Sequence, residues 1–224
     1  MKIVVVIFSI LMSLATVAQA QFSKIHVGLA FPDEMWEDRD KKIKIPGEGK
    51  GGGFTAMGYN IGYKRCWQSP YFNGVAAVLG VDVFYNELNK DYKKYTEGQK
   101  WENVIYPKHI NVPVSFGFFM HNFDSDKKLY IEAAMGINFS MITKYSFAGK
   151  SGYQDMVYKY KPSVGVTVDM EAGVLFSKKV SIGLKMNYLN NRHKYKIQYE
   201  QAKNKNDSFP LVILRMSLCM GICF

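Results

Sequence analysis

The sequence has little of what a disulfide-stabilised protein or a helical membrane protein requires. Only three of its 224 residues are cysteines and only seven are prolines. A small, odd number of cysteines argues against a framework of several disulfides, and their positions do not have the spacing of a metal site. Beyond the first 20 residues, no apolar stretch approaches the roughly 20 residues that a transmembrane helix needs.

The state of the cysteines has two interpretations. Cys219 and Cys223 lie too far apart along one extended segment to bond each other. Cys66 is expected at the same end of the molecule as Cys223, which leaves a bridge between these two residues open. Buried free thiols are the favoured interpretation, because a free cysteine behaves as a small apolar residue.

The one long apolar run, at the N-terminus, has the features of a secretory signal peptide. Lys2 supplies a short positive region, residues 3–17 are mostly apolar, and Ala18-Gln19-Ala20 is a typical cleavage site. A helical anchor is the less favoured alternative, because the run is short for a spanning helix. We expect a signal peptide at residues 1–20 and one exported domain at residues 21–224.

The chain carries an excess of positive charge, with 29 Lys and Arg against 19 Asp and Glu. Such a balance is often typical of nucleic-acid binding, but an export signal argues against that partner. The excess lies in connecting segments rather than along one strip. We therefore expect phosphate-rich lipid headgroups, and not nucleic acid, as the acidic neighbours.

Strict alternation of apolar with small or polar residues dominates the exported part. It is clearest between positions 212 and 224, where the apolar residues share one face and the chain ends on Phe224. The same period of two occurs at about residues 22–31, 54–64, 75–85, 110–118, 129–139, 164–176 and 180–188. Each segment is close to the length of about 9–11 residues that lets a tilted strand cross a bilayer. The pattern predicts an all-β fold, an eight-stranded antiparallel transmembrane β-barrel of the outer-membrane type.

Other patterns agree with a barrel. Long segments rich in Tyr and Lys alternate with shorter ones such as Ser177-Lys178-Lys179, as expected for external loops and periplasmic turns. Glycines fall on the less apolar faces, where they make room inside a narrow barrel. Aromatic residues are expected at both strand ends, with Tyr63, Tyr130 and Phe224 at the periplasmic end. Pro113 interrupts one strand, where we expect a bulge or a local irregularity.

Six charged residues are expected on the inward face. They are Asp82, Glu132, Asp169, Glu171, Lys185 and Arg215. The tight turn centred on Lys178 fixes a register that puts Glu171 directly opposite Lys185. Buried charges must be paired, and eight strands leave no aqueous channel, so we interpret the set as a structural ion-pair network. A proton or ion path through the lumen is the less favoured alternative.

The sequence predicts no catalytic, cofactor or metal site. His26 and His109 are expected to face inward, but no Ser-His-Asp arrangement can be recognised. Lys194, Tyr195 and Lys196 alternate as if the last hairpin continued outside the membrane. Lysines among aromatic residues can contact lipopolysaccharide phosphates or glycans, although a solvated strand extension is the favoured interpretation of this segment.

The chain resembles a known family of outer-membrane barrels, the one that includes PorT. The resemblance is carried by the segment His109-Ile110-Asn111-Val112-Pro113-Val114, by Gln21 at the mature start, by the glycine-rich strands and by the terminal Phe224. It covers the whole exported part. For some members it implies an accessory role in a secretion system, and it carries over no functional residues.

These patterns lead us to expect a monomeric, non-enzymatic barrel of a Gram-negative outer membrane, either structural or interaction-mediating, with a filled lumen. Its expected partners are outer-membrane lipid and lipopolysaccharide, with envelope or secretion proteins as further candidates. An accessory barrel of a secretion system is the second candidate, a narrow channel the third and a lipid-modifying enzyme the fourth. A soluble lipocalin-like barrel is not favoured, because it would place its apolar side chains inside.

Overall fold

The described part of the chain consists of strands and the short segments that join them. The computed structural model describes residues 22–35, 57–68, 74–87, 101–122, 127–149, 155–176, 179–199 and 205–224. The predicted signal peptide, residues 1–20, lies outside the described residues. Within these ranges, no helix is long and apolar enough to cross a membrane.

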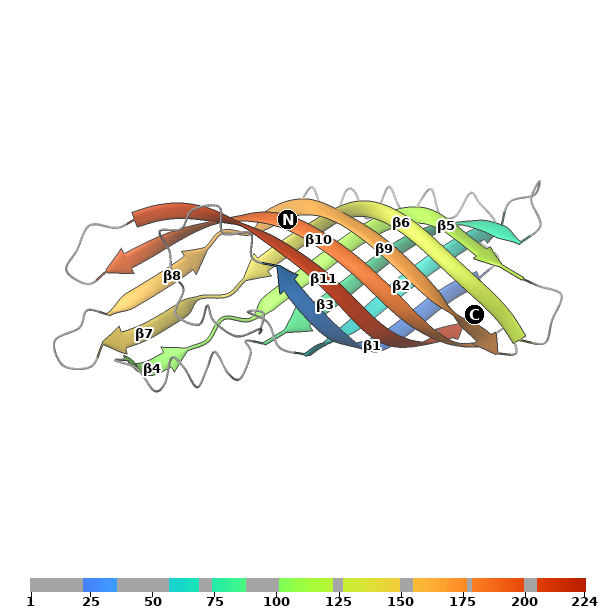
Figure 1. Cartoon of the computed structure of the whole chain (residues 1–224), viewed down its shortest axis with the longest axis horizontal. Coiled ribbons are helices and arrows are strands. Elements are labelled where there is room, and N and C mark those ends of the chain that lie inside the picture. The colour runs from blue at the N-terminus through green and yellow to red at the C-terminus, as the bar shows by residue number, and fades with distance from the viewer. Residues whose placement is uncertain are drawn as a thin grey trace.

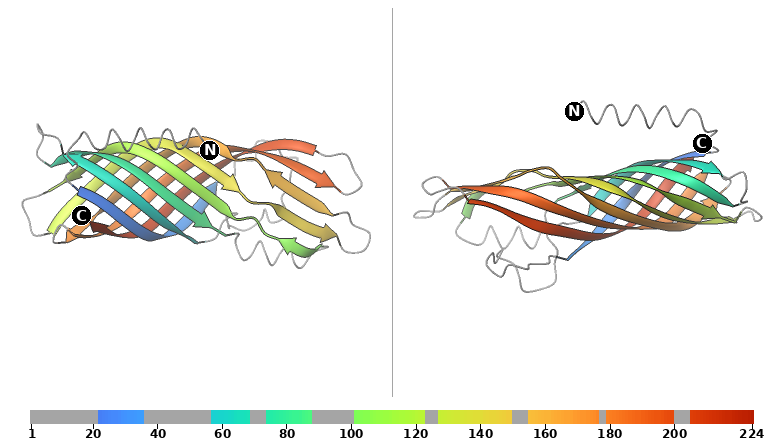
Figure 2. Two further views of the ribbon diagram at one scale, coloured as in Figure 1. Left: turned by 180° about the vertical axis from the view of Figure 1, so that it is seen from behind. Right: turned by 90° about the horizontal axis from the view of Figure 1, so that it is seen from above.

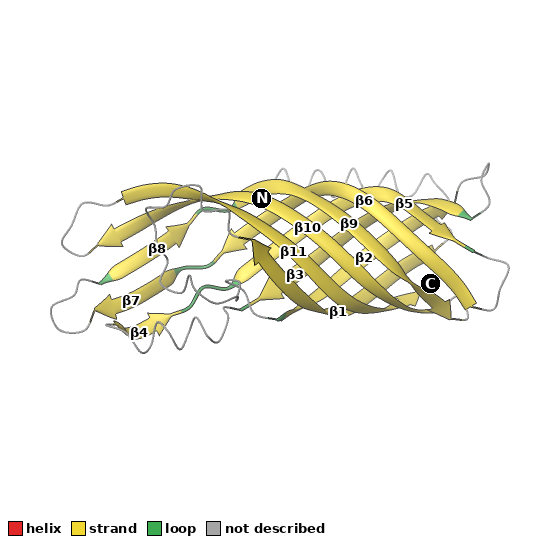
Figure 3. Ribbon diagram, in the orientation of Figure 1, coloured by secondary structure: helices red, strands yellow, loops and turns green. Residues whose placement is uncertain are grey.

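Within the described ranges, eleven strands form one antiparallel sheet (Figure 3). They are β1 (Phe22–Met35), β2 (Gly58–Gln68), β3 (Val75–Asn86), β4 (Trp101–Ile105), β5 (His109–His121), β6 (Lys127–Ile142), β7 (Tyr145–Gly149), β8 (Met156–Tyr160), β9 (Ser163–Phe176), β10 (Val180–Tyr199) and β11 (Lys205–Cys223). Eight of them close into a ring in the order β1-β2-β3-β5-β6-β9-β10-β11, and β11 pairs again with β1 (Figure 1). The predicted eight-stranded antiparallel barrel is confirmed.

Side chains alternate between the lumen and the exterior along every strand of the ring. On β11, Leu218 is 52% exposed and points outward, whereas its neighbour Ser217 is fully buried inside. Apolar outward residues occur on each strand of the ring, and the buried inward positions are rich in polar and charged residues. This is the reverse of a water-soluble barrel and the arrangement that a hydrocarbon surrounding requires.

Aromatic side chains lie where the outward face meets the membrane edge. Tyr63, Phe118 and Phe224 are exposed at the end of the ring that holds the short turns, and Phe139 and Tyr188 at the opposite end. Tyr130 also lies at the periplasmic end, as predicted, but its side chain points into the lumen and is buried, so it is not one of the lipid-facing aromatic residues. The alternation along β6 already places Tyr130 on the inward face, because its chain neighbours Leu129 and Ile131 point outward.

Pro113 leaves a gap in one ladder but no bulge. The pairing of β3 with β5 includes Val81 with Val114 and Phe84 with Asn111, and the two intervening pairs are not formed. The register is the same on both sides of this gap, and Pro113 keeps its place opposite Asn138 of β6. A proline has no N–H to give to β3, so the strand loses ladder bonds on one side only.

The three cysteines are free and buried. Cys66 on β2 and Cys223 on β11 belong to one apolar cluster at the periplasmic end of the lumen. They lie on opposite sides of β1, because Cys66 pairs with Phe22 and Cys223 with Lys24. Two strand spacings amount to about 9–10 Å between backbones, which is beyond the reach of a disulfide.

An external sheet extends beyond the ring, and the sequence patterns did not predict its short strands. β10 and β11 have 20 and 19 residues, and their outer halves pair with each other. β8 then pairs with β10, β7 with β8 and β4 with β7. Figures 1 and 2 show this sheet continuing from one side of the barrel, at the end away from the C-terminus.

Candidate functional site

All six of the charged residues predicted to face inward lie in the lumen. They come from β3 (Asp82), β6 (Glu132), β9 (Asp169 and Glu171), β10 (Lys185) and β11 (Arg215), and none is more than 2% exposed. Two further lysines, Lys24 of β1 and Lys64 of β2, are also buried among them, at 3% and 1% exposed. The described lumen thus contains four carboxylates and four permanent cations, so its charges balance.

The first cluster of the lumen network lies nearer the periplasmic end and centres on Glu171. Its Oε1 is 2.5 Å from Lys24 Nζ, and its Oε2 is 2.5 Å from Lys64 Nζ. The Lys64 ammonium also donates to both carboxylate oxygens of Glu132, at 2.7 and 2.8 Å. Tyr130 donates its hydroxyl to Glu171 Oε1 at 2.6 Å. Side chains from β1, β2, β6 and β9 therefore join across the lumen.

The second cluster lies one layer further out and centres on Asp82. Lys185 Nζ is 2.5 Å from Asp82 Oδ2, and His26 Nε2 is 2.7 Å from Asp82 Oδ1. Lys185 is also 3.9 Å from Asp169 Oδ2. Asp169 in turn accepts hydrogen bonds from Asn187 and Thr167. This cluster connects β3, β1, β10 and β9.

The predicted register of Glu171 is confirmed, but the ion pair inferred from it was wrong. Glu171 does lie directly opposite Lys185. Its carboxylate nevertheless reaches Lys24 and Lys64, while Lys185 turns to Asp82. Strand alternation identifies Lys24 and Lys64 as inward residues, so the sequence held a signal for them. Which long side chains meet across a closed lumen depends on the curvature of the ring, which pairwise register does not describe.

Arg215 lies next to the second cluster, toward the outer end of the lumen, with its guanidinium group against the ring of Phe84. Its guanidinium carbon is 4.5 Å from the centroid of Phe84, and the Lys185 ammonium is 5.6 Å from the same centroid. Both distances are within the range of a cation–π contact. Phe84 is fully buried, so the ring and the two cations fill the middle of the barrel.

Glycines create the space for both clusters. A Cβ atom on Gly183 would lie 2.5 Å from the Tyr130 hydroxyl and 3.0 Å from Glu171 Oε1. A Cβ atom on Gly62 would overlap the ring of His26 and the carboxylate of Asp82. These close approaches explain why the inward face carries residues without side chains directly beside its largest polar groups.

A layer of histidine, serine and asparagine side chains closes the outer end of the ring. Ser140 Oγ lies between His109 Nε2, at 2.9 Å, and His193 Nε2, at 3.1 Å. His193 also contacts Ser163, at 3.2 Å, and Asn138 donates to Asn191. An apolar cluster of Ile142, Leu189, Leu211 and Ile213 is buried close to this layer. Because Ser140 and both histidines are buried, the layer offers no access to a large substrate.

The external sheet has two chemically different faces. Tyrosines from three strands stack on the face that continues the lumen side: Tyr195 and Tyr160 have centroids 5.9 Å apart, and Tyr158 and Tyr145 5.6 Å apart. The opposite face continues the lipid-facing side and carries Lys159, Lys161, Lys194 and Lys196. Lys196 and Lys159 are directly paired, and the Lys161 amide donates to the Lys194 carbonyl.

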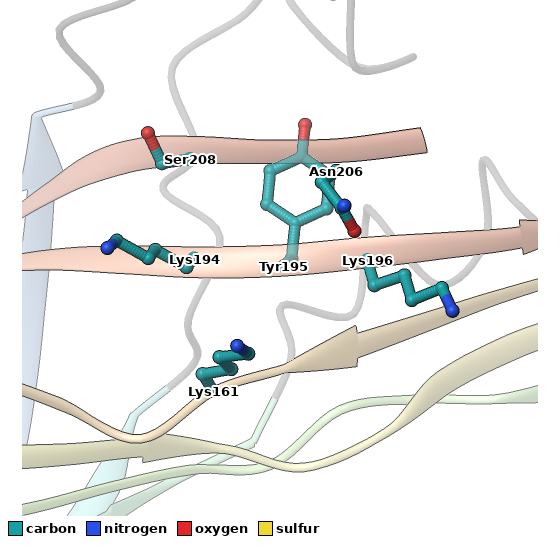
Figure 4. A pocket seen from close by; sticks show the side chains of 6 residues that line it. All are labelled: Lys161, Lys194, Tyr195, Lys196, Asn206 and Ser208. Carbon is teal, nitrogen blue, oxygen red and sulfur yellow. The ribbon is translucent and has the colours of Figure 1, made fainter. Parts of the chain in front are cut away.

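A hollow of about 540 Å³ lies on the external sheet, beside these lysines. It is lined by Lys161 of the β8–β9 connection, Lys194, Tyr195 and Lys196 of β10, and Asn206 and Ser208 of β11 (Figure 4). Ser208 pairs with Lys194 and Asn206 with Lys196, so hydroxyl and amide groups stand beside the ammonium groups. Within the described ranges, no group of three His, Cys, Asp or Glu residues is placed to hold a metal ion.

The sequence matches no protein-family model and no curated protein. Among solved structures, the chain is similar to the outer membrane protein OprG from Pseudomonas aeruginosa, with a TM-score of 0.51 and 13% identity over 92% of this chain and 97% of that one. Ail of Yersinia pestis matches with a TM-score of 0.46 and 12% identity over 91% of this chain and 98% of its own. AlkL, solved in lipid bilayers, matches with a TM-score of 0.49 and 12% identity over 92% and 91% of the two chains.

At these identities the likeness to OprG establishes the fold alone, and that fold is the small outer-membrane β-barrel. The chain's own exterior agrees with it, since apolar residues face outward on all eight strands of the ring. A closed barrel with such an exterior satisfies its backbone groups in lipid. The protein is therefore a small barrel of the outer membrane.

Proposed function

We propose that this protein is a non-enzymatic, monomeric outer-membrane barrel that acts through its external sheet. The barrel serves as the anchor, and the sheet formed by β4, β7, β8 and the outer halves of β10 and β11 contacts molecules at the cell surface. The proposal includes export by the N-terminal signal peptide. The observation that carries it is the contrast between a filled lumen and a large, one-sided structure outside it.

The filled lumen argues against transport as the main activity. Four buried carboxylates and four buried cations form clusters that bridge opposite strands, and Phe84 lies between them. An eight-stranded ring has an interior just wide enough for such side chains. Buried ion pairs of this kind are costly to separate, so ions are not expected to pass between them.

The external sheet supplies the surface for contacts. The membrane-crossing part of a strand needs only about 9–11 residues, whereas β10 has 20. β10 and β11 each continue about ten residues beyond the membrane as a paired hairpin, and β8, β7 and β4 add to it in turn, which produces a wall of paired strands rather than a loop. Residues on rigid strands hold a binding surface more accurately than residues on loops.

Removal of the external hairpin tests this proposal. Replacing residues 192–210 with an Asn-Gly turn joins Asn191 to its ladder partner Leu211, so the register of the ring strands and both charged lumen clusters are kept. The variant is expected to retain the heat-dependent gel mobility of a folded barrel, and neither form is expected to give conductance steps in a planar bilayer. Wild-type protein is expected to bind lipopolysaccharide and the variant is not. Regular conductance steps, or equal binding by both forms, would contradict the proposal.

An accessory role in a secretion system, as in PorT-like barrels, is the second candidate. The segment His109-Ile110-Asn111-Val112-Pro113-Val114 supports it by resemblance, and so does the edge position of β4, which pairs with β7 alone among the described strands. A sheet edge can accept a strand from a partner. Deleting the gene should then retain secreted cargo in the periplasm, and mild cross-linking through position 104 should capture an envelope protein. Normal secretion in the deletion strain would exclude this candidate.

A further inference from the structure

We propose that the lysines on the outer face of the external sheet bind the phosphate groups of the glycolipid in the outer leaflet. This lysine face consists of Lys159, Lys161, Lys194 and Lys196. The inference rests on the proposed function, because it assigns a ligand to the same external sheet. It is carried by the direction, the charge and the height of these side chains above the membrane.

The direction of the lysine face follows from strand parity. Met186, Tyr188, Asn190, Arg192 and Lys194 occupy successive outward positions on β10 and are all exposed. The face that contacts hydrocarbon at Met186 is therefore the same face that carries Lys194. The lysines point toward the surrounding lipid and not over the mouth of the barrel. A ligand between neighbouring lipids and the sheet would meet them directly.

The charge arrangement of the lysine face favours a bound anion. Lys196 and Lys159 are directly paired, and Lys161 and Lys194 are joined through their backbones two residues further along the same ladder. Like charges directly opposite each other on a sheet destabilise it. Among the residues that the structure describes, no carboxylate forms an ion pair with any of these four lysines. A bound polyanion would convert the repulsion into attraction.

The hollow beside the lysines fits a phosphorylated sugar. It has a volume of about 540 Å³, and Asn206 and Ser208 line it together with three of the lysines (Figure 4). Ammonium groups bind phosphate as point charges, and amide and hydroxyl groups can hydrogen-bond to sugar hydroxyls. The lining therefore combines the two kinds of group that a phosphorylated sugar presents.

The height of the lysine face above the membrane favours a glycolipid over an ordinary phospholipid as the ligand. Tyr188 is the last aromatic outward residue on β10, and Lys194 follows six residues later. At about 3.3 Å per residue and a tilt of about 40°, six residues rise about 15 Å. Phospholipid headgroups extend only about 5–8 Å beyond the hydrocarbon. Lys194 and Lys196 therefore stand at the level of the sugars of a glycolipid such as lipopolysaccharide.

Charge-neutral variants of the full mature chain test the site. The patch variant combines Lys161→Gln, Lys194→Gln and Lys196→Gln. The control variant makes the same change in charge at three exposed lysines elsewhere, with Lys108→Gln, Lys144→Gln and Lys179→Gln. Both folded proteins are titrated with phosphorylated lipopolysaccharide, with the same lipopolysaccharide after enzymatic dephosphorylation, and with phosphatidylglycerol, each in mixed micelles.

The patch variant is expected to bind phosphorylated lipopolysaccharide about tenfold or more weakly, and the control variant within about twofold of wild type. Wild-type protein should bind the dephosphorylated form as weakly as the patch variant does, and phosphatidylglycerol should not distinguish the three proteins. Equal losses in both variants, or binding that survives removal of phosphate, would overturn the inference.

Thermal stability gives a second measurement. The difference in melting temperature between the patch variant and wild type is expected to change sign when the ligand is added. In neutral detergent the patch variant should melt at or above the wild-type temperature, because like-charge repulsion is removed. With phosphorylated lipopolysaccharide it should melt below wild type, because the bound ligand no longer stabilises it. A patch variant that melts below wild type in both conditions would overturn the inference. If the patch variant binds normally and the 192–210 replacement does not, the lysine site fails while the proposed function stands.

Discussion

Glu171 and Lys64 are 107 residues apart in the sequence, and their side chains meet across the lumen at 2.5 Å. They belong to β9 and β2, which are not neighbours in the ring. The same glutamate holds Lys24, and the same lysine holds Glu132. One carboxylate therefore connects four strands, and it is the residue whose loss should affect the barrel most.

We expect Glu171→Ala to destabilise the barrel by about 3–5 kcal/mol, because the buried Lys24 ammonium loses its carboxylate partner and the buried Lys64 ammonium keeps only Glu132. The protein is unfolded with urea in detergent, and unfolding is monitored by the loss of heat-dependent gel mobility. The quantity compared is the urea concentration at the midpoint. Glu87→Ala is the control, since Glu87 is exposed and a surface carboxylate contributes about 1 kcal/mol or less. Equal midpoints for Glu171→Ala and wild type would mean that the lumen network does not stabilise the fold.

The space beside the clusters predicts a ranking of glycine substitutions. Gly183→Ala should cost about 1–3 kcal/mol, because its new Cβ atom lies against the Tyr130 hydroxyl, Glu171 and a backbone oxygen. Gly80→Ala should cost less, because its Cβ atom would first meet Ser115 Oγ, at 3.3 Å, and the flexible chain of Lys64. Both values come from urea unfolding in the same detergent. The reverse ranking would show that the lumen around Glu171 is not tightly packed.

The buried position of His193 leads us to expect that the protein loses stability in acid. This histidine lies on β10 beyond the membrane-crossing part, and its burial lowers its pKa to about 4 from the usual 6.5. A lowered histidine pKa means that the unfolded chain takes up the proton first. Its contribution is complete above pH 6.5 and is lost as the pH falls toward 4, by up to about 3 kcal/mol.

The acid effect can be measured by amide exchange in the β10–β11 hairpin between pH 7.5 and 4.5. His109 and Arg215 lie near this site, and neither is replaced in the test variant. In His193→Gln the pH dependence of exchange, corrected for its intrinsic rate, should become flatter. An unchanged profile in this variant would exclude His193 as the titrating group.

The cysteine geometry predicts three free thiols in the folded protein. All three are buried, and the backbones of Cys66 and Cys223 are separated by β1. A maleimide reagent should leave the refolded barrel unmodified and add three labels after unfolding in SDS, as read by mass spectrometry. A mass two units lower that is restored by reductant would reveal a Cys66–Cys223 bridge.

Much of the ring could be predicted from the sequence because one physical rule governs it. Lipid on one side and a narrow polar lumen on the other force the side chains of β11 and the other ring strands into a period of two. The same parity placed Asp82, Glu171 and Lys185 inside, and the tight turn predicted at residues 177–179 gave the pairing of β9 with β10. Inward facing and local register were therefore both available from the sequence.

The contacts across the lumen and the external sheet could not be predicted in the same way. Glu171 forms ion pairs with Lys24 and Lys64 and not with Lys185, which lies directly opposite it. In the closed ring, side chains of non-adjacent strands come as close to each other across the lumen as side chains of adjacent strands. β4, β7 and β8 have five residues each and lie outside the membrane, where no hydrocarbon imposes a long apolar face. Tyr158 and Tyr160 do alternate with Lys159, but so short a run does not distinguish a strand from a loop.

Contacts between side-chain methyl groups and lipid tails test the central claim most directly. With methyl-labelled protein in nanodiscs, NMR cross-peaks to acyl-chain protons are expected for Leu184 and Leu218, which are 51% and 52% exposed on the outside of the ring. No such cross-peaks are expected for Leu189 and Leu211, which are 0% and 1% exposed and lie on the inward faces of the neighbouring strands β10 and β11. Cross-peaks from the second pair, or none from the first, would contradict a barrel whose alternate side chains face the membrane.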